Sequence, residues 1–235
     1  MILKHMRISA VIPTFMEEQY IATLLSQLAK TEPSIEIVVV DSKSQDNTVE
    51  IAKRFTEKVY QIRERGIARA RNYGANQANG NLIVFLDADV KLPTNFAEKL
   101  HETFKDASIV GATCNIMPEQ GTFFEKAFFK FYNILIQITA KFKPHARGEF
   151  FAVRKKEFMQ IGGFDESLPC LEDHDLARRL SKLGKFVFMD SLTVYESMRR
   201  FRKTGFSKVV GTWIIDYIFL SLRGKPLSKF WHPVR

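Results

Sequence analysis

Carboxylates at the ends of two apolar runs are the residues whose spacing first suggests chemistry. Asp41 comes directly after Val38-Val39-Val40, and Asp87 and Asp89 come directly after the apolar run 83–86. In a parallel α/β sheet, ligands bind beyond the carboxyl ends of the strands. Mg²⁺ and Mn²⁺ prefer carboxylate and phosphate oxygens. We therefore expect Asp87 and Asp89 to hold a divalent cation beside a nucleotide diphosphate, although an Asp-x-Asp pair after a strand can also cap the turn that follows.

A second acidic group stands at the start of a predicted helix. Glu172, Asp173 and Asp175 fall within four residues. Acidic side chains are favoured in the first turn of any helix because they oppose its dipole. Like charges this close can also raise one pKa into the range that suits a general base. We therefore take these three as candidate catalytic residues. His174, between them, is either a metal ligand or, as we expect, a residue of the helix surface.

The elements that would position these carboxylates alternate between strand and helix. Apolar β-rich runs predict strands, and apolar residues spaced by three and four predict helices. The predicted strands are 8–13, 36–40, 59–62, 82–86, 108–115, 148–153 and 186–189. The predicted helices are 21–28, 49–55, 67–78, 93–104, 123–142 and 171–183. This alternation predicts an α/β fold with a mostly parallel central sheet flanked by helices.

A series of motifs, in this order, resembles the inverting glycosyltransferase family 2, whose fold is called GT-A. The motifs are 10–14 with Glu17, 37–42 with Ser44, Asp46 and Thr48, 66–80 ahead of 86–89, 148–154, and 162–166 with Glu172 and Asp173. The resemblance covers about residues 8–197. It implies a GT-A domain at 1–198, with a nucleotide-binding half at about 1–110 and an acceptor half at 111–198.

The resemblance also implies roles for single residues. The donor would be a nucleoside-diphosphate sugar, UDP in preference to GDP, the cofactor Mn²⁺ or Mg²⁺, and the sugar, most often a hexose, would be transferred with inversion. On this analogy the residues that bind the nucleotide sugar are Pro13, Thr14, Glu17, Asp41, Arg71 and Asp87. Asp41 would reach the nucleoside, Asp87 the ribose or the metal, and Asp89 the metal. Asp173 would deprotonate the acceptor hydroxyl, with Asp175 as the second choice.

Two positions depart from the pattern of the family. Ser42 stands where many members carry a second acidic residue, and Met16 stands where an Asn is frequent. Arg71 is our choice among Arg65, Arg69 and Arg71 for a contact with the diphosphate, although a basic helix face is more often simply solvated. The departures leave the identity of the general base open between Asp173 and Asp175.

The C-terminal segment 199–235 differs in composition from the rest of the chain. It holds nine Lys or Arg residues and only Asp216 as an acidic residue, so it carries most of the net charge of +9. Residues 209–222 are rich in large apolar side chains but are too few to span a bilayer, which needs about 20. We expect a basic amphipathic helix that lies on a membrane surface. The residues expected to meet the membrane are Trp213, Ile214, Tyr217, Ile218, Arg199 and Arg200.

A second apolar stripe at helical spacing leaves two interpretations open. Its residues are Phe124, Phe128, Phe131, Leu135, Ile138 and Phe142. The stripe either packs on the sheet or on a partner subunit, or it adds to the surface that meets the membrane. The same choice exists for the C-terminal helix, where the excess of positive charge favours the membrane. An acceptor at the membrane would then be a glycan or a lipid-linked molecule.

Composition and missing motifs weigh against other classes of protein. No G-x-G-x-x-G follows a strand, which argues against a dinucleotide oxidoreductase. The segment 14–18 lacks the glycine-rich loop and lysine expected of a nucleotidyltransferase, the nearest enzymatic alternative. No recognition motif for nucleic acid accompanies the basic residues.

Cys114 and Cys170 are spaced for neither metal nor a disulfide framework, and no secretory signal is evident, so we expect a cytoplasmic protein peripherally bound to the inner face of the membrane. A membrane-docked protein that binds nucleotide sugars or glycans without catalysis remains a further alternative.

Overall fold

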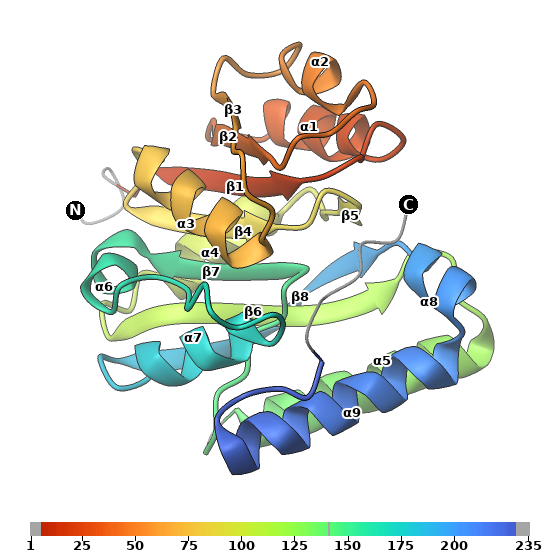
Figure 1. The fold of residues 1–235 in the computed structure, drawn as a ribbon. Coiled ribbons are helices and arrows are strands. Elements are labelled where there is room, and N and C mark those ends of the chain that lie inside the picture. The colour runs from red at the N-terminus through yellow and green to blue at the C-terminus, as the bar shows by residue number, and fades with distance from the viewer. Residues whose placement is uncertain (1–5, 141, 229–235) are drawn as a thin grey trace.

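A twisted sheet of eight strands organises residues 6–140 and 142–228, which the computed structural model describes. The strand order is β3-β2-β1-β4-β7-β6-β8-β5 (Figure 1). The strands are β1 Ile8–Thr14, β2 Glu36–Asp41, β3 Val59–Gln61, β4 Leu82–Leu86, β5 Val90–Lys91, β6 Ile109–Pro118, β7 Phe150–Arg154 and β8 Lys185–Glu196. Strands β1 to β4 pair in parallel, whereas β7 is antiparallel to both β4 and β6. Because β6 and β8 are again parallel, most strands end at one rim.

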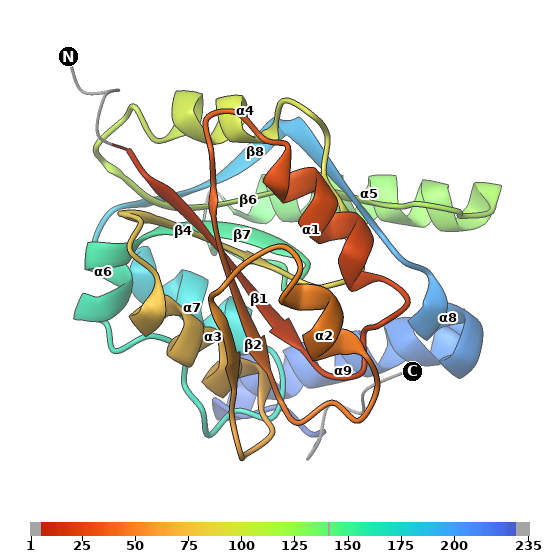
Figure 2. The same ribbon diagram turned by 90° about the horizontal axis from the view of Figure 1, so that it is seen from above.

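Helices cover both faces of the sheet, as the continuous apolar runs in its strands require. The helices are α1 Ile21–Ala29, α2 Thr48–Ala52, α3 Ile67–Gln77, α4 Phe96–Thr103, α5 Phe123–Thr139, α6 Lys155–Gln160, α7 Glu172–Leu180, α8 Arg199–Thr204 and α9 Phe206–Arg223. One core joins alternate strand residues to α1, α2, α4, α5, α8 and α9. The other joins the remaining strand residues to α3, α6 and α7. Figure 2 shows α1 and α2 near β1 and β2.

Helix α3 packs unusually close to the sheet because of one glycine. A Cβ atom on Gly74 would collide with the side chain of Val11 and would lie 3.0 Å from Val40 Cγ2. The absence of a side chain therefore lets the helix approach β1 and β2. This approach brings the buried Arg71, one turn earlier in α3, against the centre of the molecule.

The predicted α/β architecture is confirmed, and the differences lie mostly in the second half. Helix α4 begins at Phe96, helix α5 ends at Thr139, and residue 141 of the expected helix 123–142 lies outside the described residues. Strand β5 and helix α6 were not expected from the sequence. Strand β8 continues to Glu196, well beyond the expected 186–189, because it pairs along the full length of β6 through register shifts.

The segment after Ser197 does not form a separate tail in the described residues. Phe201 of α8 and Val209 of α9 are 3% and 4% exposed and belong to the core on one face of the sheet. Helices α5 and α9 run in the same direction along one margin (Figure 1), with their backbones apart (Figure 2) and side chains reaching between them. Phe128 contacts Phe206 at one end, and Lys143 donates a hydrogen bond to Ser221 at the other.

Candidate functional site

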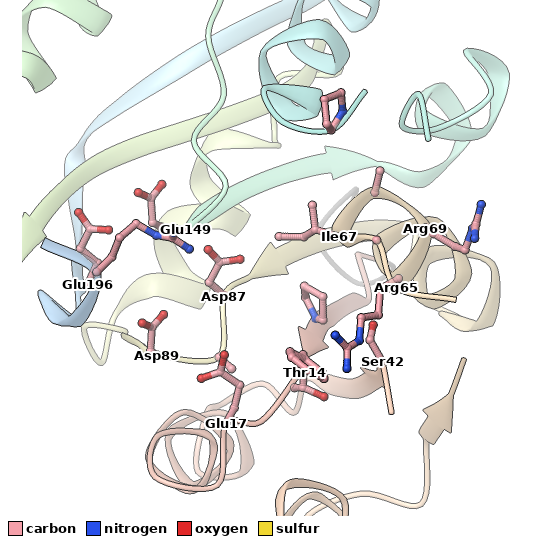
Figure 3. A pocket seen from close by; sticks show the side chains of 18 of the residues that line it. Thr14, Glu17, Ser42, Arg65, Ile67, Arg69, Asp87, Asp89, Glu149 and Glu196 are labelled. Atoms are coloured by element: carbon pink, nitrogen blue, oxygen red, sulfur yellow. The ribbon is translucent and has the colours of Figure 1, made fainter. Parts of the chain in front are cut away.

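A cleft of about 640 Å³ opens at the rim where β1, β4 and β8 end. Its walls come from the loop after β1, the segment before and at the start of α3, the turn after β4, and the start of α8. Figure 3 shows the acidic side chains gathered on one side of this cleft, with Thr14, Ser42 and Arg65 on the other. Pro13, Thr14 and Glu17 line it, as expected of nucleotide-binding residues.

Carboxylates from four segments converge in this cleft. They are Glu17, Asp87, Asp89, Glu149 and Glu196. Burial, together with the charges of Asp89 and Glu149, raises the pKa of Asp87 to about 7 in spite of the nearby Arg71. Burial also raises the pKa of Asp89, although Arg199 opposes this effect. So many acidic groups in one place attract a cation, which would relieve their mutual repulsion.

Glu149 and Glu196 form a pair that the sequence reasoning did not single out. Burial and the charge of Glu149 raise the pKa of Glu196 well above its ordinary value. Burial disfavours ionised Glu149 as well, but Arg147 and the hydrogen bond with Glu196 outweigh it and lower its pKa. A proton shared by this pair would therefore lie on Glu196 in preference to Glu149. Arg147 Nη2 lies 3.6 Å from Glu149 and 3.9 Å from Glu196.

A signal for Glu149 was present in the sequence, because it belongs to the 148–154 motif. Glu196 ends β8, but the predicted strand stopped at 189, so the sequence did not mark it. Arg147 gives no such signal, because two of its partners, Glu196 and Asn133, come from other segments of the chain. Its Nη1 donates to Asn133 of α5, so the helix and the glutamate pair are joined by one guanidinium.

Arg199 lies inside the cleft, which corrects its expected place at the membrane. Its Nε is 2.9 Å from Asp89 Oδ2, and its Nη1 is 2.7 Å from Glu17 Oε2. Its guanidinium also lies over the ring of Tyr20. A side chain with two carboxylate partners and 17% exposure is not available to an anionic lipid. Its neighbour Arg200 lines the same cleft.

Asp87 and Asp89 meet the requirements of a divalent cation bound together with a nucleotide. Among residues 6–140 and 142–228, no three His, Cys, Asp or Glu side chains are already arranged around one point. Mg²⁺ in nucleotide sites commonly uses only one or two protein carboxylates and takes its other ligands from phosphate and water. Two adjacent carboxylates in the cleft at the end of β4 supply that number of hard oxygen ligands. The residues therefore fit the metal that the sequence predicted.

Asp41 is not among the residues that line the cleft, so its expected contact with the nucleoside stays a prediction. It is fully buried, and it accepts hydrogen bonds from Thr14 Oγ1 at 3.1 Å and from the Ser44 backbone N–H at 2.9 Å. The carboxylate thus holds together the ends of β1 and β2. The adjacent Ser42 lines the cleft instead.

Arg71 is also placed differently from the expected contact with a diphosphate. Its side chain is 0% exposed, its Nη2 lies 2.9 Å from Asp87 Oδ1, and its Nη1 lies 2.7 Å from Glu172 Oε1. Nη2 also donates to the carbonyl of Gly148 at 2.8 Å. Arg71 therefore connects the candidate metal site to the acidic start of α7. Arg65, by contrast, lines the cleft and lies over the ring of Phe15.

The acidic start of α7 separates into residues with different surroundings. Burial and the charge of Asp173 raise the pKa of Glu172 to about 7, although Arg71 acts against this. Asp173 Oδ1 accepts a hydrogen bond from the His174 backbone N–H. Asp175 instead pairs with Arg178 at 3.0 Å and Arg179 at 2.6 Å on its own helix. Asp175 therefore stabilises α7, and Asp173 is the better placed candidate base.

Backbone strain accompanies this helix start. Leu171, directly before Glu172, has φ of 60°. This left-handed conformation is unfavourable for residues with a branched side chain and is held only where surrounding structure requires it. The turn directs Glu172 and Asp173 into a second cavity.

This second cavity, which we call the groove, has a volume of about 520 Å³ and lies between α5, α9 and the start of α7. Four residues line both the groove and the cleft, namely Ile67, Asp87, Glu149 and Trp213. Glu172 and Asp173 line the groove alone. His174, expected on the helix surface, is only 12% exposed in its side chain and packs beside His145 and Tyr217. It makes no contact with Asp87 or Asp89.

The four remaining residues expected at a membrane divide into two pairs. Trp213 stacks on Tyr132 and meets Phe201 edge-on, and Tyr217 packs against His145. Ile214 and Ile218 are 55% and 46% exposed. No helix in the described part of the chain is both long and apolar enough to cross a bilayer.

The sheet order and the carboxylate cleft at its rim define the GT-A class of fold, which is that of many glycosyltransferases. Residues 9–162 match the family model described as Glycosyl transferase family 2, and the chain therefore belongs to this family. The GT-A fold and the family that the sequence predicted are both confirmed.

Solved structures at low identity share this fold. The mannosyltransferase PcManGT from Pyrobaculum calidifontis, in complex with GDP-Man and Mn²⁺, has a TM-score of 0.76 at 20% identity, over 93% of this chain and 65% of that one. TarS from Staphylococcus aureus with UDP-GlcNAc has a TM-score of 0.67 at 21% identity, over 82% of this chain and 58% of that one. Glucosyl-3-phosphoglycerate synthase from Mycobacterium tuberculosis, with Mn²⁺, UDP-Glc and phosphoglyceric acid, has a TM-score of 0.63 at 18% identity, over 95% of this chain and 81% of that one.

Curated relatives are longer than this chain. The poly(ribitol-phosphate) β-N-acetylglucosaminyltransferase TarS of Staphylococcus aureus is 33% identical over 112 residues, which are 44% of this chain and 18% of that protein. The dolichol-phosphate mannosyltransferase of Pyrococcus furiosus is 33% identical over 110 residues, which are 44% and 31%. The matched part thus spans less than a third of either relative.

Proposed function

We propose that the protein is an inverting, metal-dependent glycosyltransferase that moves a sugar, most often a hexose, from a nucleoside-diphosphate sugar to an acceptor at a membrane surface. One observation carries this proposal. Asp87 lines both the cleft and the groove, and Arg71 links it to Glu172, the neighbour of Asp173. A donor in the cleft and an acceptor in the groove would therefore meet at Asp87, between the metal site and the base.

The donor end of the reaction belongs to the cleft. Thr14, Glu17 and Ser42 line its wall at the ends of β1 and β2, where a nucleoside would lie. Arg65 and Arg200 also line it and are the cations we assign to the diphosphate. We favour UDP over GDP because two of the three solved structures described above hold uridine donors. Bound Mn²⁺ or Mg²⁺, held by Asp87 and Asp89, would neutralise charge on the departing diphosphate.

The chemical step is a single displacement. Asp173 takes the proton of the acceptor hydroxyl while that oxygen forms a bond to the anomeric carbon of the sugar. The bond from the anomeric carbon to the diphosphate oxygen breaks with its electron pair going to the diphosphate. Attack from the face opposite the leaving group inverts the anomeric configuration. Glu172 and Arg71 do not touch the reacting atoms in this scheme and position Asp173 and Asp87.

Turnover of sugar nucleotides by variants tests the proposal. Wild-type protein is incubated with UDP and GDP sugars, Mn²⁺ and native membranes, and products are identified by mass spectrometry and by NMR of the anomeric centre. Asp89→Ala and Asp173→Asn should lose nearly all turnover, whereas Asp190→Asn, an exposed aspartate on β8, should keep it. Full activity of both site variants would show that the assigned roles are wrong.

The membrane surface that we propose is the outer face of α5 and α9. Apolar residues with at least 44% exposure gather there, namely Phe123, Phe124, Phe131, Ile134, Leu135, Ile138, Phe142, Ile214, Ile215, Ile218 and Leu222. Exposed lysines flank them at 126, 130, 143 and 208. An apolar face with cationic flanks is the pattern of a helix pair that lies in the interface of an anionic bilayer. This membrane would be the inner face of the cell membrane.

Sedimentation with vesicles tests this surface. The protein should sediment with vesicles of phosphatidylglycerol at low salt, and Phe124→Ser combined with Leu222→Ser should reduce binding. Met159→Ser combined with Leu183→Ser removes two exposed apolar residues elsewhere and should not. Truncation at Ser197 is unsuitable, because it would remove Phe201 and Val209 from the core. Equal binding by both double variants would exclude the α5 and α9 face.

A further inference from the structure

The groove between α5 and α9 combines two chemically different ends. Its inner end contains Glu172 and Asp173 and opens to the cleft beside Asp87 and Glu149. Its outer part is lined by apolar side chains of both helices, namely Phe128, Phe131, Leu135, Ile136, Val210, Ile214 and Ile218. Phe131, Leu135, Ile214 and Ile218 belong also to the exposed apolar face of the two helices. The groove thus leads from a water-excluding surface to the candidate base.

Several polar side chains within the groove make contacts inside the protein. Asp216 accepts hydrogen bonds from the backbone N–H and the hydroxyl of Ser228, at 2.8 Å and 2.6 Å. His145, His174 and Tyr217 pack their rings against one another. Burial and the neighbouring His174 lower the pKa of His145 to about 3, so this imidazole is neutral. Between the two ends the walls therefore present mainly aromatic and aliphatic surface, and the one carboxylate among these residues, Asp216, is bound by Ser228.

Charge complementarity limits the head group that can reach the inner end. The carboxylates of Asp87, Glu149, Glu172 and Asp173 surround it, and Arg71 and Arg147 are each shared between two of the carboxylates of the site. A phosphate here would face several negative charges with no unshared cation among these lining residues. A neutral hydroxyl can donate to a carboxylate at no such cost.

We infer that the groove binds the acceptor as a lipid, with one apolar chain between α5 and α9 and a neutral hydroxyl or sugar head beside Asp173. The inference rests on the proposed function only for the role of that hydroxyl. A cavity of this size is in the range that holds a small ligand largely buried. The chain would enter from the apolar face, so the acceptor would not have to leave the membrane interface completely.

Binding of soluble single-chain amphiphiles tests the groove without any membrane or turnover. Trp213 lines the groove, and Trp231, outside the described residues, is replaced by Phe so that only Trp213 reports. Butyl, octyl and dodecyl glucosides brominated on the chain are added below their critical micelle concentrations, and quenching is measured. Affinity should rise by about fourfold for each methylene until the groove is filled. An alkyl phosphate of equal length should bind at least about tenfold more weakly because of its charge.

Neighbouring isoleucines on α9 supply a matched control. Ile214 and Ile215 are similarly exposed, but only Ile214 lines the groove. Ile214→Asp should weaken binding of the dodecyl glucoside by at least about tenfold, and Ile215→Asp should not. Leu135→Asp and Ile134→Asp provide the same comparison on α5 if an α9 variant does not fold. Equal effects within both pairs, affinity independent of chain length, or a groove closed by a second copy of the chain in sedimentation analysis would overturn the inference.

The same measurements separate this inference from the proposed function. If quenching depends on the alkyl-chain length of the glucoside but no sugar nucleotide is turned over, the lipid groove is supported and glycosyl transfer is rejected. If turnover depends on Asp173 but quenching does not depend on alkyl-chain length, glycosyl transfer is supported and the lipid groove is rejected.

Discussion

The guanidinium of Arg199 lies 2.9 Å from the carboxylate of Asp89, at the position where a divalent cation is expected. The same side chain pairs with Glu17. In the protein without ligand, a positive charge of α8 therefore already neutralises part of the cleft. A cation that binds Asp89 must compete with this charge or displace it.

Replacement of Arg199 should strengthen binding of the cation to the protein alone. Arg199→Gln removes the competing charge and leaves Glu17 and Asp89 unneutralised, so the affinity for Mn²⁺ should rise by about tenfold. Calorimetric titration with Mn²⁺ in the absence of nucleotide measures this change. Arg178→Gln removes an equal charge from the exposed side of α7 and should have little effect. Weaker Mn²⁺ binding in Arg199→Gln would contradict the competition.

The position of Arg71 should depend on the lack of a side chain at residue 148. A Cβ atom on Gly148 would lie 3.1 Å from Arg71 Nη2, closer than normal contact. Gly148→Ala should shift the guanidinium away from Asp87 and lower kcat by about tenfold, since small displacements in a site have large effects on rate. Turnover of the purified variant, with circular dichroism to verify folding, measures this. An unchanged kcat would show that the bridge through Arg71 tolerates the shift.

Close packing of α3 on the sheet predicts a loss of stability in Gly74→Ala. The added methyl group would collide with Val11, and overpacking of a filled core typically costs about 1–3 kcal/mol. Gly211→Ala in α9 is the matched control, because nothing lies within 4 Å of its Cβ position. Alanine is favoured over glycine inside a helix, so this control should gain about 0.5–1 kcal/mol. Both values come from urea unfolding, and an unaffected Gly74→Ala would mean that α3 can move outward.

Glu172 should make stability depend on pH in a direction unusual for a carboxylate. Its pKa is raised from an ordinary value of 4.5 to about 7, so the folded protein retains a proton that the unfolded chain has lost. Its contribution is complete below pH 4.5 and disappears as the pH rises to about 7. In metal-free protein, Glu172→Gln should therefore gain stability relative to wild type across this range. Unfolding by urea at several pH values measures the difference, and a constant difference would refute the raised pKa.

The sequence was most informative where strong local patterns coincide with buried elements. The run 82–86 and its two following aspartates gave β4 and the candidate metal site, because an apolar strand between helices has few alternative interpretations. Strand β8 was only partly foreseen, since the polar pair Asp190-Ser191 interrupts its apolar pattern. The strand continues because the register with β6 shifts between Cys114 and Asn115.

Roles that depend on distant partners were beyond the reach of the sequence. Arg199 was assigned to the membrane from the local excess of positive charge, but its partner Glu17 lies 182 residues earlier. Asp41 was assigned to the nucleoside by the family resemblance, yet Thr14 and Ser44 donate hydrogen bonds to its carboxylate. In both cases the role depends on a contact with a residue far away in the sequence, and the residues around Arg199 or Asp41 give no sign of that contact.

The complete burial of Arg71 has a consequence for how mutational surveys of such enzymes should be interpreted. Its guanidinium is shared between Asp87 and Glu172, so its loss would disturb both ends of the reaction at once, even without any contact between Arg71 and the sugar. Ranking positions by lost activity would then place Arg71 beside residues in direct contact with the sugar. A comparison of lost activity with the exposure of each side chain would separate buried positioning residues from residues that contact the substrate.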